Sequence, residues 1–139
     1  MEEIIQRLQL AVEKLKRSIA TDLQKVSITT PQLLMLHLID KAEKSKLTDL
    51  AEKMAVKPSA ITVMIDRLEK PGFVKRTHDP DDRRSIIVQL TPLGKEMLTI
   101  AIEERNAIIK TYLALLEPEE ILQLTDIIEK VVNKKQEMK

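Results

Sequence analysis

The sequence predicts a mainly α-helical protein with one small β-hairpin near the middle of the chain. Apolar residues recur at spacings of three and four along most of the chain, and two short β-branched segments interrupt that period. The length of 139 residues corresponds to a single domain. Hydrophobic residues make up 43% of the sequence but aromatic residues only 1%, so we expect an aliphatic core.

Six helices are expected, over residues 3–26, 31–43, 47–54, 58–70, 92–116 and 118–136. A proline in the first turn is compatible with a helix because its missing N–H would have no partner there. Four of the helices are expected to begin in this way, at Pro31, Pro58, Pro92 and Pro118. Thr30, Thr48 and Thr91 are the predicted N-caps, because a threonine hydroxyl accepts a hydrogen bond from a free N–H of the first turn.

The hairpin is expected between the fourth and fifth helices. Residues 73–77 and 86–90 are β-branched or aromatic segments that flank a turn-forming sequence. Gly72 is expected to end the preceding helix in the left-handed conformation. The second helix is apolar on nearly all sides, which predicts a central position in the fold, with His37 as a hydrogen-bonded core residue.

Composition excludes several functional classes. Without cysteine there is no disulfide, thiol nucleophile or cysteine-containing zinc site, and two glycines cannot build a glycine-rich phosphate loop. No metal-ligand spacing or Ser/His/Asp motif is present, so we expect neither an enzyme nor a cofactor. The longest run of Leu, Ile, Val and Met side chains, residues 33–36, is too short for a membrane span, and Glu2 and Glu3 stand where a secretory signal is basic. A cytoplasmic protein without a membrane partner is expected.

The terminal helices carry more apolar surface than one stripe requires. A surplus of this width indicates a buried helix or an interface between chains. We therefore expect a homodimer, with a self-contained helical bundle as the alternative. The residues expected at the dimer interface are Ile5, Leu8, Val12, Leu15, Leu116, Ile121, Leu124, Ile128 and Val131.

The order of short helix, turn, helix and β-hairpin is that of a winged helix-turn-helix, a DNA-binding fold. Residues 58–70 would be the recognition helix, with Ile61, Met64, Ile65 and Leu68 facing inward. The candidate DNA contacts in and just before this helix are Lys57, Ser59, Ala60, Thr62, Val63, Arg67 and Lys70. Small side chains allow the helix to approach the groove closely, and hydroxyls pair with base edges. The alternative is that they merely solvate a surface helix.

The hairpin turn carries three acidic residues followed by Arg83 and Arg84. Arginine is favoured in a narrow minor groove because the negative potential is enhanced there. Asp82 lies two residues before Arg84, and we predict that its carboxylate pairs with and orients the guanidinium. Charge alone does not indicate DNA binding. Residues 57–84 hold 7 basic and 5 acidic side chains, in a chain of net charge +1.

Several short motifs together closely resemble the multiple-antibiotic-resistance repressor (MarR) family, in motif detail over residues 28–98 and in helix order over the whole chain. These motifs are Thr30-Pro31-Gln32 with Leu36, Leu47-Thr48-Asp49-Leu50-Ala51, Ser59-x-x-Thr62, Asp66-Arg67-Leu68-Glu69, Gly72-Phe73-Val74-x-Arg76, Asp79-Pro80-x-Asp82-x-Arg84 and Leu90-Thr91-x-x-Gly94.

The resemblance implies a homodimeric repressor that binds double-stranded DNA at a pseudopalindromic operator. Residues 1–28 and 98–139 would form the helical dimerisation region, and residues 29–97 the DNA-binding domain. Arg84 would enter the minor groove with Asp82 as its orienting partner, and Thr62 with its neighbours would read the major groove. A small aromatic or phenolic effector is also implied, at a site that the sequence does not identify.

Two departures from the family pattern stand out. Val63 replaces an arginine found in some members, which removes a candidate guanine contact worth about 1–3 kcal/mol. Pro71 disfavours helical geometry at Lys70, so we expect the recognition helix to end slightly early. A helical dimeric protein-interaction module without DNA binding is the alternative function, but it leaves the arginine-bearing turn without a purpose.

Overall fold

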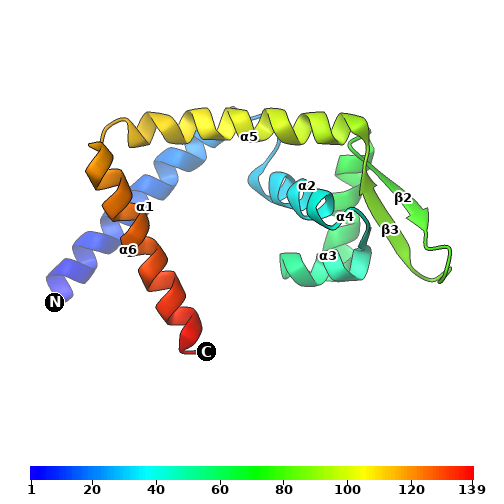
Figure 1. The fold of residues 1–139 in the computed structure, drawn as a ribbon, viewed down its shortest axis with the longest axis horizontal. Coiled ribbons are helices and arrows are strands. Elements are labelled where there is room, and N and C mark those ends of the chain that lie inside the picture. Colours follow the sequence, from blue (N-terminus) through cyan, green and yellow to red (C-terminus); the bar gives the residue numbers. More distant parts are fainter. The chain divides into compact units, whose positions relative to one another are not determined.

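The computed structural model describes residues 1–139 and contains six helices and three short strands (Figure 1). Their order confirms the predicted mainly α-helical fold with a hairpin wing. The elements are α1 (Glu2–Leu23), α2 (Thr30–Ala42), β1 (Ser45–Lys46), α3 (Leu47–Met54), α4 (Pro58–Glu69), β2 (Val74–His78), β3 (Ile86–Leu90), α5 (Pro92–Leu113) and α6 (Pro118–Glu137).

The chain forms two compact units, Met1–Arg105 and Asn106–Lys139. The second unit holds the end of α5 and all of α6, and none of the α6 side chains is buried. The first unit contains the segment from α2 to β3 (residues 30–90), which we call the lobe. No helix of the structure combines the length and apolar character that crossing a lipid bilayer requires.

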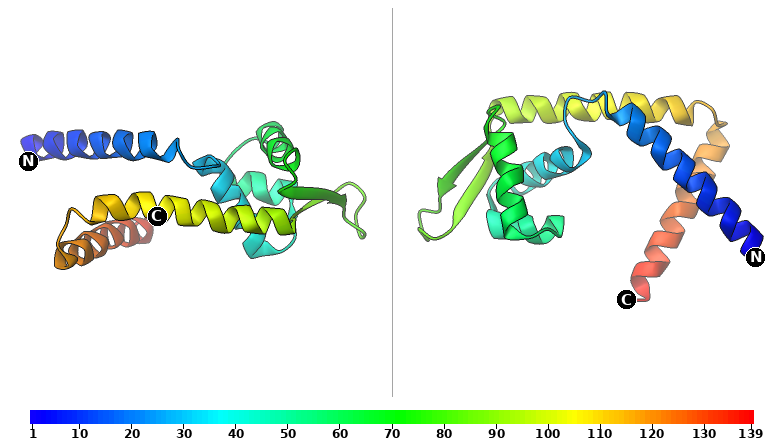
Figure 2. Two further views of the ribbon diagram at one scale, coloured as in Figure 1. Left: turned by 90° about the horizontal axis from the view of Figure 1, so that it is seen from above. Right: turned by 180° about the vertical axis from the view of Figure 1, so that it is seen from behind.

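The three strands form an antiparallel sheet in the order β1-β3-β2. β2 pairs with β3 from Val74 opposite Leu90 to His78 opposite Ile86, as expected for a hairpin. β1 was not predicted, because two residues are too few to show an alternating pattern; its Ser45 pairs with Val88. Figure 2 shows the paired strands β2 and β3 extending beyond α3 and α4 as a ribbon. This ribbon is the wing.

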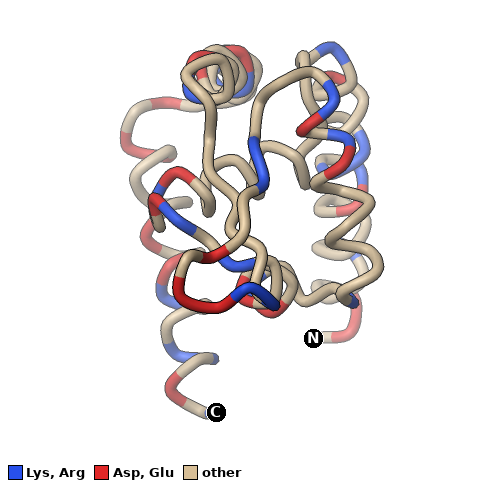
Figure 3. The backbone as a smooth tube through the Cα atoms, turned by 90° about the vertical axis from the view of Figure 1, so that its right-hand side faces the viewer, with Lys and Arg blue, Asp and Glu red and all other residues tan.

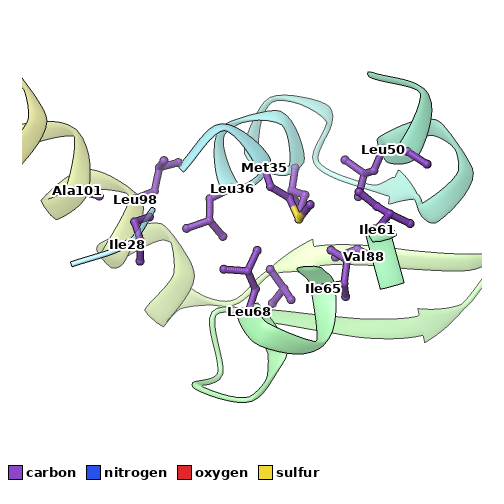
Figure 4. Packing of buried hydrophobic residues seen from close by; sticks show 13 residues of the cluster. Ile28, Met35, Leu36, Leu50, Ile61, Ile65, Leu68, Val88, Leu98 and Ala101 are labelled. Carbon is purple, nitrogen blue, oxygen red and sulfur yellow. The ribbon is translucent and has the colours of Figure 1, made fainter. Parts of the chain in front are cut away.

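The core of the lobe is aliphatic, as the composition predicted. Side chains from α2, α3, α4, β2 and β3 meet there, together with Ile28 and two residues of α5 (Figure 4). Its most deeply buried large side chains are Met35, Leu36, Ile39, Leu50, Ile61, Ile65, Leu68 and Val88. Only one side of α2 faces the core, because Leu34 and His37 are exposed. The prediction that His37 is a core residue is therefore wrong.

Two of the predicted N-caps, Thr30 and Thr48, are wrong. α2 is capped by Thr29 rather than Thr30: Gln32 N donates to Thr29 Oγ1 at 3.2 Å, and Thr29 N donates to Gln32 Oε1 at 3.0 Å. This reciprocal capping box needs a glutamine three residues after the cap, which selects Thr29. α3 begins at Leu47, so Thr48 lies inside its first turn and is not the cap. The reason is that Lys46 is held extended by pairing with Ile87 in the sheet.

The end of α4 confirms the role of Gly72, which has φ 89°. Gly72 N donates to Glu69 O and Phe73 N donates to Leu68 O, the bond pattern of a Schellman motif. Lys70 keeps helical geometry with φ −55° and ψ −49°, so the predicted loss of helical geometry at this residue is wrong, although α4 ends at Glu69, one residue before the predicted end. Lys70 N still donates to Asp66 O at 3.0 Å, and the Schellman bonds follow directly, which outweighs the local bias.

The start of α5 is joined to this helix end. Thr91 is the predicted N-cap and accepts a hydrogen bond from Gly94 N at 3.0 Å. Its hydroxyl also donates to Gly72 O. A Cβ on Gly94 would lie 1.9 Å from Phe73 O, so only glycine permits this approach. The hairpin is thereby anchored at its base to the end of α4 and the start of α5.

Candidate nucleic-acid interface

α4 presents a surface of small and basic side chains on the side opposite the core. Ile61, Ile65 and Leu68 are buried and Met64 is half-buried, as predicted. The turn before α4 places Ala55 in the left-handed region, with φ 54° and ψ 43°, and this redirects the chain from α3 into α4. All of the DNA contacts predicted in and just before this helix are exposed: Lys57, Ser59, Ala60, Thr62, Val63, Arg67 and Lys70.

The hydroxyl of Thr62 is already used as a donor. Thr62 Oγ1 donates to Pro58 O at 3.1 Å, one turn back along the helix. The oxygen keeps its acceptor capacity, so in this rotamer Thr62 suits a base that offers an amino group. Val63, beside it, is 48% exposed and offers a methyl surface for a thymine methyl.

The tip of the wing is a turn organised by aspartate side chains. Asp79 N donates to Ser85 O at 3.0 Å, and Asp79 Oδ1 accepts from Asp81 N at 2.9 Å. The Asp79 side chain is only 13% exposed, and its carboxylate also lies 4.0 Å from Lys46 Nζ. The acidic residues of this turn therefore shape its backbone, as aspartates in turns commonly do.

Asp82 holds the backbone of Arg84 rather than its guanidinium. Asp82 Oδ1 accepts from Arg84 N at 3.1 Å, and Oδ2 accepts from Ser85 Oγ at 3.1 Å. The predicted pairing of the Asp82 carboxylate with the Arg84 guanidinium is therefore wrong. The backbone N–H two residues ahead is the nearest donor that an aspartate can reach, so it captures the carboxylate. The guanidinium groups of Arg83 and Arg84 remain exposed at the tip.

The start of α4 and the wing tip lie on either side of one small cavity. Its volume is about 240 Å³, and Thr62, Arg84 and Lys46 are among the residues that line it. The structure thus brings together two residues, 22 positions apart in the sequence, for which we predicted different grooves. Figure 3 views the molecule from the wing end and shows basic and acidic segments interspersed there, without one uniformly basic field.

An ion-pair cluster between α4 and β2 was not predicted from the sequence. Arg76 Nη2 lies 2.7 Å from Glu69 Oε1 and 2.7 Å from Asp66 Oδ1, while Nε donates to Glu69 Oε2 at 3.2 Å. Arg76 holds the pKa of Glu69 below its ordinary value, mainly by hydrogen bonding. The two carboxylates in turn raise the pKa of Arg76. All three residues belong to the motifs shared with the MarR family. Their separations of seven and ten residues across a turn, however, form no pattern that predicts an ion pair.

Most of the residues predicted at the dimer interface are exposed in the single chain. Exposed members are Ile5, Leu8, Val12, Leu15, Leu124, Ile128 and Val131, while Leu116 and Ile121 are half-buried. Neither α1 nor α6 contains a buried residue. The dimer itself stays a prediction.

A larger cavity, of about 590 Å³, lies where α1, the linker after it and the start of α2 approach Arg105 of α5. Apolar side chains such as Ile19 and Leu23 line it together with the basic residues Lys16 and Arg105, and no carboxylate lines it. Beside it, the Glu104 carboxylate accepts hydrogen bonds from Ser27 N at 3.1 Å and from Ser27 Oγ at 2.8 Å. No sequence pattern indicated this site, because its walls come from distant segments.

Comparison with known proteins gives consistent results. The family model described as MarR family matches residues 28–86. The HTH-type transcriptional repressor MdtR of Bacillus subtilis (strain 168) is 36% identical over 144 positions, covering 100% of this chain and 93% of that protein.

Solved structures agree with this match. The YusO protein from Bacillus subtilis has a TM-score of 0.80 at 34% identity, with 95% of this chain and 96% of that chain covered. A cysteine-to-serine mutant of MarR from E. coli, crystallised with operator DNA, has a TM-score of 0.68 at 25% identity, with 93% of each chain covered.

Proposed function

Because the chain belongs to the MarR family, we propose that it is a transcriptional repressor that binds a pseudopalindromic DNA operator as a homodimer. The observation that carries this proposal is the shared surface of α4 and the wing. There, the exposed side chain of Thr62 and the exposed guanidinium of Arg84 line one cavity. A helix and a ribbon presented together are what adjacent major and minor grooves of a duplex accept.

In the proposed complex α4 lies in the major groove. Ser59, Ala60, Thr62 and Val63 are small, so the helix backbone can approach the base edges. Lys57, Arg67 and Lys70 contact phosphates, which supplies affinity without sequence information. Val63 offers no guanidinium to a guanine, so DNA shape and phosphate contacts supply a large part of the preference.

The wing supplies the second contact. The Asp82 carboxylate holds the turn by binding the backbone of Arg84, so the Arg84 and Arg83 guanidinium groups are free to enter the minor groove. Binding of free guanidinium groups requires no internal ion pair to be broken first. Thr62 and Arg84 would therefore contact neighbouring grooves of the same half-site.

The apolar residues of α1 and α6 form the proposed dimer interface. Residues 1–28 and 98–139 act as the dimerisation region and residues 29–97 as the DNA-binding domain. Two lobes then face half-sites about 34–36 Å apart, one helical turn of DNA. The alternative of a helical interaction module is not favoured, because the relatives matched are transcriptional regulators. A regulator of chromosomal genes would act in the cytoplasm.

The 590 Å³ cavity is the proposed effector site. Its apolar walls suit an aromatic ring, and Lys16 and Arg105 suit a carboxylate or phenolate. Since the cavity adjoins the linker that joins α1 to α2, a ligand there would alter how the dimerisation helices hold the lobes.

The proposal is tested by selecting duplexes from a random-sequence pool with the purified protein, then footprinting the selected sequence. We expect two protected half-sites about one helical turn apart. Phenolic acids added at increasing concentration should release the DNA. Failure to enrich any sequence would refute the proposed function, and a single protected half-site would refute the dimer geometry.

A further inference from the structure

We propose that Arg76 is a positioning residue for DNA binding: with Asp66 and Glu69 it fixes the wing relative to α4, so that Thr62 and Arg84 engage one duplex together. This inference rests on the proposed function and names a residue to which that function assigns no contact. We call the three residues the Arg76 cluster.

The cluster joins the two elements that carry the proposed contacts. Arg76 lies on β2, on the same side of the strand as the buried Val74, and its side chain is 27% exposed. Glu69 and Asp66 lie in the last turn and a half of α4. The guanidinium meets Glu69 with two donors, Nε and Nη2, and meets Asp66 with Nη2. A two-pronged contact fixes orientation as well as distance, which a single contact does not.

Beyond this point β2 leaves the core, while Ile86 and Ile87 of β3 stay half-buried. Thr77 and His78 are exposed, and most of the turn over residues 79–84 is exposed as well. β3 continues toward the core at Val88, but the strand on its other side, β1, has only two residues. The other ion pair at the wing, between Lys46 Nζ and Asp79 Oδ2, is long, at 4.0 Å. The Arg76 cluster is therefore the last strong connection between α4 and the projecting ribbon.

Rigid connection matters because two contacts on one duplex reinforce each other only when their spacing is set in advance. Once α4 is in the major groove, a fixed wing presents Arg84 at high effective concentration, whereas a loose wing loses that advantage. Removing Arg76 should therefore lower the contribution of Arg84, although Arg76 contacts no base in the proposal. It would also leave the Asp66 carboxylate unpaired on the proposed DNA face of α4, where it would repel phosphate.

The test is a double-mutant cycle on binding to a duplex selected from a random-sequence pool. Arg84→Ala is measured in the wild-type chain and in Arg76→Met, which keeps a long apolar side chain without the guanidinium. We expect Arg84→Ala to weaken binding about tenfold in the wild-type chain and about twofold or less in Arg76→Met. Arg17→Met is the matched control, because it removes an equal charge from the exposed Arg17–Glu13 pair on α1.

In the Arg17→Met background the tenfold effect of Arg84→Ala should persist. A purely structural role for Arg76 would lower the melting temperature but leave the effect of Arg84→Ala equal in both backgrounds, and that result would overturn the proposal. Circular dichroism checks that each variant is folded. If Arg76→Met does not fold, Glu69→Gln replaces it in the same cycle, because it weakens the two-pronged contact at nearly constant volume.

Two further outcomes separate the proposals. If no duplex is enriched by the wild-type protein, the proposed function fails and this inference with it. If a duplex is enriched but Arg84→Ala has no effect on its binding, the repressor function stands and the positioning role of Arg76 is refuted.

Discussion

The lobe and the terminal helices differ in what they do with their apolar residues. In the lobe, Ile61, Ile65 and Leu68 of α4 turn away from water and meet α2, α3 and β3. In α1 and α6 no residue is buried, and the apolar stripes of both helices face solvent within a single chain. The lobe therefore has its own core, while these helices carry the kind of surface that a second chain would cover.

This contrast also appears in the ion pairs. The Arg76 cluster joins residues seven and ten positions apart across a turn, with the guanidinium partly shielded from solvent. Arg17 and Glu13 on α1 form an ordinary exposed pair at i,i+4. Pairs of the second kind contribute little, whereas a two-pronged pair that links two elements restricts their relative orientation.

A core substitution in the lobe should have the largest effect on stability. Ile65→Ala should destabilise the protein by about 2–5 kcal/mol, because it removes a fully buried side chain and leaves a cavity. Denaturant unfolding followed by circular dichroism measures the change. Val63→Ala, an exposed position on the same helix, is the control and should cost far less. Equal losses at both positions would contradict the assigned inner and outer faces of α4.

The complementary substitution tests the surface of α1. Leu8→Glu should weaken self-association about 100-fold, roughly 2.7 kcal/mol, because it places a charge in the proposed dimer interface. Analytical ultracentrifugation across a concentration series measures this. Gln9→Glu adds the same charge one position away without removing an apolar side chain. A wild-type protein that is monomeric at micromolar concentration would refute the interface outright.

The wing arginine gives a smaller effect that is confined to DNA binding. Arg84→Ala should weaken binding to the selected duplex about tenfold while leaving the dimer intact, because it removes one minor-groove contact. Fluorescence anisotropy at fixed salt measures the affinity. For comparison, Arg67→Ala should weaken binding to selected and random duplexes alike, as expected for a phosphate contact. Unchanged affinity for Arg84→Ala would count against the proposed role of the wing.

The smallest expected effect concerns acid stability. Arg76 lowers the pKa of Glu69, so the ion pair stabilises the folded state above the ordinary carboxyl pKa of 4.5. This contribution is lost as the pH falls through the lowered, folded-state value. The difference in unfolding free energy between wild type and Glu69→Gln should be constant from about pH 7 to pH 5 and shrink below about pH 4.5. It should not exceed about 1 kcal/mol, because the pair is partly exposed.

The features that depend on residues close to one another in the sequence were predicted best. The four proline-led helices, the Gly72 helix end and the inward face of α4 depend on neighbours within about one turn, and all were predicted. The errors at Thr30, Thr48 and Lys70 have separate causes. Gln32 completes a capping box with Thr29, Ile87 holds Lys46 extended in the sheet, and the Schellman bonds follow Lys70 directly.

The candidate site also has features that the sequence predicted and features that it did not. Exposure of Ser59, Thr62, Val63 and Arg84 was predicted, since helical period and turn composition determine which side chains face outward. The Arg76 cluster and the effector cavity were not predicted. Both need residues brought together from separate elements, and no spacing in the chain encodes such a meeting.

By itself, the sequence determined the order of helices and hairpin, the aliphatic core of the lobe, the family and the identity of the exposed arginines. These depend on local periodicity, on turn chemistry and on motifs that lie within short segments. Only the tertiary structure decided that Asp82 binds backbone instead of guanidinium, and that Arg76 ties the wing to α4. A carboxylate pairs with the donor that the fold brings closest, and the positions of those donors are set by packing between elements rather than by the order of residues.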